Sequence, residues 1–222
     1  MVTYKSHHFY YLIDRSFLNL YYLFMKILCY LAMLILLTSC SSNNESLNIF
    51  VKLPKNIVNI ENKHAIFLLP ENFKIKKEIN SEDCESWQLN YNFQKLFINS
   101  YTKLLNSMFE NIVFIDSKLL NKEEENKKFA SFINFKENIF LLDFKTIGNT
   151  GKLKVSLTSD FIVEGNNKIV KNTIKSEQSW EKNVYLNCNV VKGASKITGI
   201  AFENLMNQAH DKIYSSVKNI VR

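Results

Sequence analysis

Few side chains in this sequence have the types and spacing that catalysis or metal binding requires. After residue 40, the histidines and cysteines, which are the usual zinc ligands, occur only far apart along the chain: His64, Cys84, Cys188 and His210. Zinc sites normally contain ligands a few residues apart, so this set predicts no metal site. Asp83 and Glu85 flank Cys84, but glycoside hydrolysis needs two carboxyl groups facing each other across a groove, roughly 5 to 10 Å apart.

The common catalytic motifs are also absent. The sequence contains no G-x-S-x-G, no P-loop, no G-x-G-x-x-G and no H-E-x-x-H. We therefore predict that the protein is not an enzyme and holds no metal or diffusible cofactor. Trp87, Trp180 and Tyr91 are candidates for a binding surface, because large aromatic side chains are enriched at interfaces. The alternative is that these three side chains lie in the core or at its rim.

The clearest signal is an ordered run at residues 25–40. Met25 and Lys26 precede an apolar run at 27–37, which ends directly in Thr38, Ser39 and Cys40. The tetrad Leu37-Thr38-Ser39-Cys40 and its preceding run resemble the signal peptide and lipobox of bacterial lipoproteins. The resemblance implies that diacylglycerol is attached to the Cys40 thiol, that the chain is cleaved between Ser39 and Cys40, and that an N-acyl chain such as palmitate is added.

This resemblance divides the chain. Residues 1–24 are expected to be an extension upstream of a natural start at Met25, residues 25–39 the signal peptide, 40–46 a polar lipidated tether, and 47–222 one periplasmic domain. Two alternatives stay open. Translation can start at Met1, which gives a long segment before the apolar run, or residues 16–37 can form an uncleaved helix long enough to span a bilayer.

The expected location is the inner leaflet of the outer membrane, facing the periplasm. Ser41 after the cysteine resembles the pattern of lipoproteins that reach that membrane; inner-membrane anchoring is the alternative. The chain carries 28 Lys and Arg against 21 Asp and Glu, a net charge of +7, but its densest basic spots at 74–77 and 127–128 have glutamates nearby. This spread predicts a solvated face and no nucleic-acid partner, while weak attraction to anionic lipid or peptidoglycan stays open.

The expected mature domain has two cysteines, Cys84 and Cys188, since Cys29 leaves with the signal peptide. In an oxidising periplasm this pair is a disulfide candidate. The loop would contain about a hundred residues, and the chain-entropy model gives about 4 to 5 kcal/mol of stabilisation. Two separate thiols are the alternative, because Cys188 lies on the apolar side of an alternating segment, where cysteine packs as a small hydrophobic residue.

Hydrophobic periodicity predicts an α+β domain. Helical spacing occurs at residues 92–108 and 194–221, and we expect His210 on the second helix to face solvent. Strand patterns occur at residues 47–53, 64–69, 111–115, 129–135, 139–144, 153–163 and 169–180, of which 111–115 is expected to be buried. The last two form a hairpin that turns at 165–168. We predict a two-layer fold, in which an antiparallel sheet of about five to six strands packs against two long helices.

The order of elements adds a second resemblance. The helix ending in Met108-Phe109 before a short strand, the hairpin turning at Gly165-Asn166-Asn167 and the alanine-bearing last helix are similar to YajG-like and other auxiliary outer-membrane lipoproteins. The likeness lies in topology and in no motif, and the two mature cysteines depart from it. It implies a non-enzymatic accessory role, such as attachment to a lipid transporter or activation of a cell-wall synthase.

Three functions are therefore compared. The first is a lipid-anchored interaction or accessory module of a membrane machine for envelope assembly or transport, with an envelope protein as its partner. The second is a carrier that holds a lipid or another apolar ligand between sheet and helices, consistent with the 17 phenylalanines. The third is a cell-wall hydrolase, for which the sequence offers no positive feature.

Substitution of the lipidated cysteine tests the anchor. We expect Cys40→Ser to accumulate as an unprocessed precursor without lipid, because no thiol remains to be acylated. Metabolic labelling with a fatty acid and the mass of the purified protein measure this. Cys29→Ser is the control and should be processed normally; normal lipid labelling of Cys40→Ser would exclude the lipobox.

Overall fold

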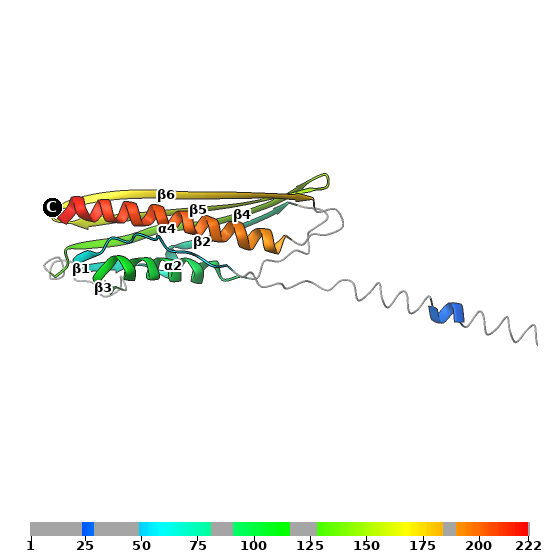
Figure 1. Cartoon of the computed structure of the whole chain (residues 1–222), viewed down its shortest axis with the longest axis horizontal. Coiled ribbons are helices and arrows are strands. Elements are labelled where there is room, and N and C mark those ends of the chain that lie inside the picture. Colours follow the sequence, from blue (N-terminus) through cyan, green and yellow to red (C-terminus); the bar gives the residue numbers. More distant parts are fainter. Residues whose placement is uncertain (1–23, 29–48, 81–90, 116–127, 184–189, 222) are drawn as a thin grey trace, which may run out of the picture. The chain divides into compact units, whose positions relative to one another are not determined.

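The computed structural model describes residues 24–28, 49–80, 91–115, 128–183 and 190–221. The chain divides into two compact units, Met1–Asn43 and Asn44–Arg222. In the first unit, the described residues 24–28 form a short helical segment. In the second unit, six strands and two long helices form an α+β domain (Figure 1).

One six-stranded sheet forms a layer of this domain. Its members are β1 Ile60–Phe67, β2 Phe73–Asn80, β3 Phe109–Phe114, β4 Ser131–Ile147, β5 Thr150–Gly165 and β6 Lys168–Asn183. The strand order is β3-β1-β4-β5-β6, and β2 also pairs with β4. β1 lies beside the first residues of β4 and β2 beside its later residues, with the 3-10 turn η1 Pro70–Asn72 between them. β1 and β2 thus share one edge of a much longer strand.

The sheet is mixed, so the prediction of a purely antiparallel sheet was wrong. β4, β5 and β6 are antiparallel, whereas β1 is parallel to both β3 and β4, and β2 is parallel to β4. Parallel neighbours need a long crossover connection. The chain between β1 and β3 contains β2 and a helix, which supplies such a crossover. Alternation of side chains carries no information on strand direction.

Both long helices cover the same face of the sheet. α2, Phe93–Met108, begins at Asn92, whose side chain accepts a hydrogen bond from the Lys95 amide as an N-cap. α4, Val191–Val221, runs along β5 and β6 and also contacts α2 (Figure 1). Among the described residues, no helix combines the length and apolar character needed to cross a membrane.

Aromatic rings join the layers. The Phe93 ring of α2 stacks on Phe140 of β4 with centroids 3.9 Å apart, and Phe97 of α2 meets Phe202 of α4 edge-on at 4.8 Å. All four side chains are fully or almost fully buried. The predicted two-layer packing with two long helices is therefore confirmed.

A bulge in β4 explains another difference from the prediction. The segments 129–135 and 139–144 were expected as two strands, but most of both belong to β4. Before the bulge, between Phe135 and Glu137, odd-numbered Ile133 and Phe135 are buried; after it, even-numbered Phe140 and Leu142 are buried. The extra residue keeps both apolar runs on the core face.

Three other segments differ from prediction. Within the expected strand at 47–53, the described residues 49–53 form no strand. β2 was not predicted, and its lysines were expected only to lie on a solvated face. Most of the segment 111–115, expected to be buried, belongs to the edge strand β3, whose Val113 and Phe114 are 36% and 44% exposed.

The β5–β6 hairpin is confirmed, and two glycines fit it against α4. Asn166 and Asn167 both have positive φ, 46° and 59°, as a two-residue hairpin turn requires. A Cβ at Gly165 would lie 2.7 Å from Ile220 Cγ2, near the end of α4. At the other end of α4, a Cβ at Gly193 would lie 2.6 Å from Trp180 Cε2. Hairpin and helix are therefore in close contact at both ends.

Alanine at Gly193 should loosen this packing. We expect Gly193→Ala to lower the free energy of unfolding by about 1 to 3 kcal/mol, because the new methyl overlaps the Trp180 ring. Gly199→Ala is the control, since its Cβ meets only Phe50 O at 3.1 Å and alanine favours the helix. Urea denaturation of the purified proteins measures both; equal stability of the two variants would contradict the close contact.

Candidate functional site

Several of the sequence-predicted sites lie outside the described residues: Ser39, Cys40, Cys84, Trp87 and Cys188. Lipidation, cleavage and disulfide pairing therefore stay predictions. Tyr91 and Trp180 are described, and both are half-buried against the core. The Tyr91 ring lies 5.2 Å from that of Phe93, and burial raises the pKa of its phenol. Trp180 covers Gly193, and no ring contact joins these two aromatic residues.

His64 is fully buried within β1. Its Nε2 lies 2.8 Å from the Glu61 carbonyl oxygen, which only accepts, so Nε2 carries the proton and Nδ1 accepts from the Ser131 hydroxyl at 2.8 Å. Burial lowers the pKa of the imidazole below its usual 6.5, although the bond to Glu61 opposes this shift. A neutral histidine with both nitrogens bonded holds β1 to β4.

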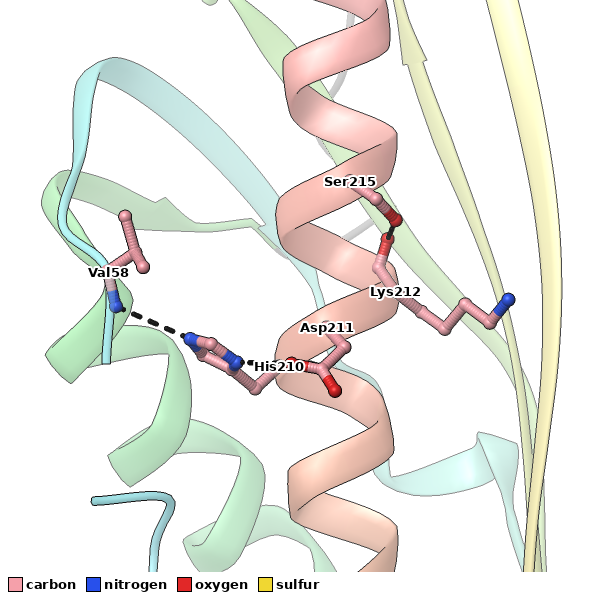
Figure 2. A network of polar contacts seen from close by, with 5 residues as sticks. All are labelled: Val58, His210, Asp211, Lys212 and Ser215. Atoms are coloured by element: carbon pink, nitrogen blue, oxygen red, sulfur yellow. Dashed lines mark hydrogen bonds and ion pairs between the residues drawn. The ribbon is translucent and has the colours of Figure 1, made fainter. Parts of the chain in front are cut away.

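His210 is a correction: its side chain was expected to face solvent, but the residue is only 7% exposed. Figure 2 shows the imidazole of α4 reaching the chain before β1, where the Val58 amide donates to Nε2 at 3.4 Å. Nδ1 lies 2.9 Å from Asp211 Oδ1 and donates to it when Nε2 accepts. The segment that covers His210 is about 150 positions away in sequence, and helical periodicity gave no sign of it.

The open face of the sheet, opposite the helices, has an apolar area at one end. We call it the turn-end patch; its members are the half-buried Phe129, Phe132 and Ile162, the exposed Ile169, and Phe67, which is only 8% exposed. The Phe132 ring lies 6.3 Å from Phe67 and 5.6 Å from Phe129. Ile169, just after the β5–β6 turn, is 64% exposed.

A surface cavity of about 530 Å³ adjoins this patch. It is lined by two aromatic rings and the hairpin turn: Phe129, Phe132, Glu164, Gly165, Asn166, Asn167, Lys168 and Ile169. The turn is held to the end of α4, since Asn166 donates to the Ile220 carbonyl at 3.0 Å and Lys168 to the Asn219 carbonyl at 3.0 Å. These bonds satisfy carbonyls that a helix end leaves unpaired. The cavity therefore has a fixed wall and a partly apolar floor.

The remainder of the open face is largely charged. Lys74 pairs with Glu137 at 2.5 Å, Lys152 with Glu181 at 2.9 Å and Lys154 with Glu177 at 3.0 Å. Hydrogen bonding to Lys74 lowers the pKa of Glu137, and hydrogen bonding to Lys154 lowers that of Glu177. These exposed pairs contribute little to stability. These pairs lie between the turn-end patch and the exposed Ile147 at the other end of the long strands. The sequence pattern did not reveal the turn-end patch because Phe67, Phe132 and Ile169 come from three different strands.

A second cavity, of about 300 Å³, lies between the start of β1 and the last turns of α4. Its Tyr214 ring stacks 6.5 Å from His210, and Lys218 Nζ lies 5.6 Å from the same ring. No group of three potential metal ligands occurs in the part of the chain that the structure describes.

Comparison with known proteins assigns no family. No family model matches the chain, and no curated protein matches its sequence. Among solved structures, it is similar to a neuraminyllactose-binding hemagglutinin homolog from Helicobacter pylori, with a TM-score of 0.48 and 9% identity over 80% of this chain and 97% of that one.

Two further structures show lower TM-scores. A hypothetical protein from Chlamydia trachomatis gives 0.39 with 13% identity, covering 69% of this chain and 96% of that one. A minor lipoprotein from Acinetobacter baumannii gives 0.35 with 12% identity, covering 67% and 93%. With TM-scores below 0.5, these similarities carry no conclusion about fold or function.

Burial of His64 predicts a pH dependence of stability. Because its pKa is lowered in the folded state, the unfolded chain binds more protons below pH 6.5. The stabilisation is complete above that pH and is lost as the pH falls toward the folded-state pKa. We expect the free energy of unfolding to fall less across this window in His64→Gln than in the unmodified protein. Urea denaturation at a series of pH values measures this, and identical pH profiles would contradict it.

Proposed function

We propose that this protein is a lipid-anchored, non-enzymatic accessory module of the bacterial cell envelope that docks an envelope protein through the turn-end patch. The observation that carries the proposal is a partly hollow area at one end of a largely charged sheet face, where aromatic rings and the exposed Ile169 lie beside the polar hairpin turn. Large apolar side chains at the centre of a surface and polar groups around it are the usual anatomy of a protein interface.

The anchor supports this proposal from the sequence. Covalent diacylglycerol and an N-acyl chain on Cys40 would hold the domain at the membrane, and residues 40–46 would act as a tether. Tethering raises the effective concentration of a domain near membrane partners, so a small patch suffices for binding. We place the protein on the periplasmic side of the outer membrane, with the inner membrane as the alternative.

The interior gives less support to a ligand carrier. In the described part of the chain, the layer between sheet and helices is filled by fully buried rings such as Phe93, Phe140 and Phe161. The two cavities described above are lined mainly by exposed and half-buried residues. A carrier would have to displace close-packed aromatic side chains in order to admit a lipid.

Two exposed isoleucines provide a matched test of the docking patch. Ile169 is 64% exposed at the β5–β6 turn, and Ile147 is 58% exposed at the other end of the long strands, beside the β4–β5 turn. In intact cells, crosslinking followed by affinity purification and mass spectrometry should recover an envelope partner. We expect Ile169→Asp to reduce that recovery about tenfold, as for a central interface residue, and Ile147→Asp to leave it unchanged.

The same measurement on Cys40→Ser tests the contribution of the anchor, and recovery of the partner should fall when the anchor is removed. Equal recovery with Ile169→Asp and Ile147→Asp would reject the turn-end patch as the docking surface. The absence of any specific partner would count against the whole proposal, and extraction of bound lipid would then test the carrier.

A further inference from the structure

β6 is an edge strand with a distinctive order of charges. It is 16 residues long and pairs only with β5 in the described sheet. Its side chains on the open face are basic before the strand midpoint, at Lys171 and Lys175, and acidic after it, at Glu177 and Glu181. Ser176 lies beside the midpoint. If the direction of the strand is reversed about Ser176, Lys171 takes the position of Glu181 and Lys175 takes that of Glu177.

The backbone of these residues faces outward. Gly165 and Lys168 close a two-residue turn and form a hydrogen-bonded pair, and such pairs alternate along an antiparallel ladder. Odd-numbered residues of β6 consequently direct their amide and carbonyl groups away from β5. The Lys175 carbonyl is consistent with this outward direction, because it accepts a hydrogen bond from Gln208 of α4 at 2.8 Å. A backbone carbonyl has two lone pairs, so the amide of a second strand can bond the same oxygen.

We propose that β6 pairs antiparallel with β6 of a second copy of this chain, about a two-fold axis through Ser176. Lys171 then lies opposite Glu181 of the second copy, and Lys175 opposite Glu177, and the symmetry repeats both pairs. Because Ser176 is beside the midpoint, almost the whole length of each strand is paired. The two sheets become one continuous sheet across the axis, which is a self-complementary contact.

The charges select this register over its neighbours. A shift by two residues in one direction places Lys175 opposite Lys175, and a shift in the other places Glu177 opposite Glu177. Parallel pairing in register stacks like charges along the strand. Opposite charges across two strands stabilise pairing, whereas like charges destabilise it. The charge order therefore favours one antiparallel register.

Charged edge strands ordinarily prevent pairing, and a row of lysines alone would have that effect. Here the lysines and glutamates are sorted into opposite halves. Glu177 and Glu181 already bond Lys154 and Lys152, but Lys171 and Lys175 have no ion-pair partner among the described residues. Carboxylate oxygens accept more than one hydrogen bond, so the lysines of a second copy can join these pairs.

Charge reversal provides the test. Two differently tagged copies of the full chain are co-expressed, crosslinked in intact cells and purified through one tag. Unmodified copies should purify together. Lys171→Glu with Lys175→Glu makes the edge acidic, and Glu177→Lys with Glu181→Lys makes it basic. Each double variant should recover itself about tenfold less, because all four cross-strand pairs become repulsive.

Co-expression of the acidic-edge variant with the basic-edge variant should restore recovery, since opposite charges again face each other. This restoration also shows that both variants fold. Lys95→Glu with Lys103→Glu, on α2, is a control with the same charge change and should leave self-recovery intact. Failure of unmodified copies to purify together would overturn the pairing, as would undiminished self-recovery of either edge variant or the absence of restoration in the mixed pair. None of these variants changes a residue of the turn-end patch. Rejection of that patch as a docking surface would therefore leave the β6 pairing unaffected.

Discussion

The packing of α4 along the β5–β6 hairpin is the constraint on which the rest of the domain depends. Its 31 residues give a helix of about 46 Å, close to the length of a 16-residue strand at about 3.3 Å per residue. Gly165 and Gly193 permit contact at the two ends, where any side chain would overlap Ile220 or Trp180. The helix therefore covers one face along nearly the full hairpin and leaves the other face open.

The long strands also place polar side chains in the core. At the bulge of β4, Asn138 turns into the core, where its Oδ1 accepts from the Ser159 hydroxyl at 2.5 Å. Among the described residues, Asn138 Nδ2 has no hydrogen-bond partner, and the Tyr101 hydroxyl is fully buried beside Ser159. Desolvation raises the pKa of Tyr101. These groups reduce the benefit of burial, and the surrounding aromatic packing compensates for them.

The surfaces left by this packing serve different purposes. The open face is charged along most of its length, and its turn end carries the apolar patch where we place the docking of another protein. The outer edge of β6 is a backbone surface with sorted charges, where we place a second copy of the chain. A membrane-tethered domain that binds both partners would bring several lipid anchors together. Such multivalent attachment increases the overall affinity of weak contacts without adding a new contact.

The sequence alone determined the parts of the structure that depend on local periodicity. The stripe of α2, the length of α4, the paired asparagines of the hairpin turn and the α+β class all follow from spacing along the chain. Tertiary structure decided what depends on direction and on distant neighbours. Alternating side chains look the same in parallel and antiparallel strand pairs. The sheet was therefore predicted with the wrong pairing direction for β1 and β3, and β2 was not predicted. Two features arise from segments far apart in sequence: His210 is buried under residue 58, and the turn-end patch brings together Phe67, Phe132 and Ile169. The sequence did not reveal them because the packing of whole strands and helices, and not the residues adjacent in the chain, decides which side chains come into contact.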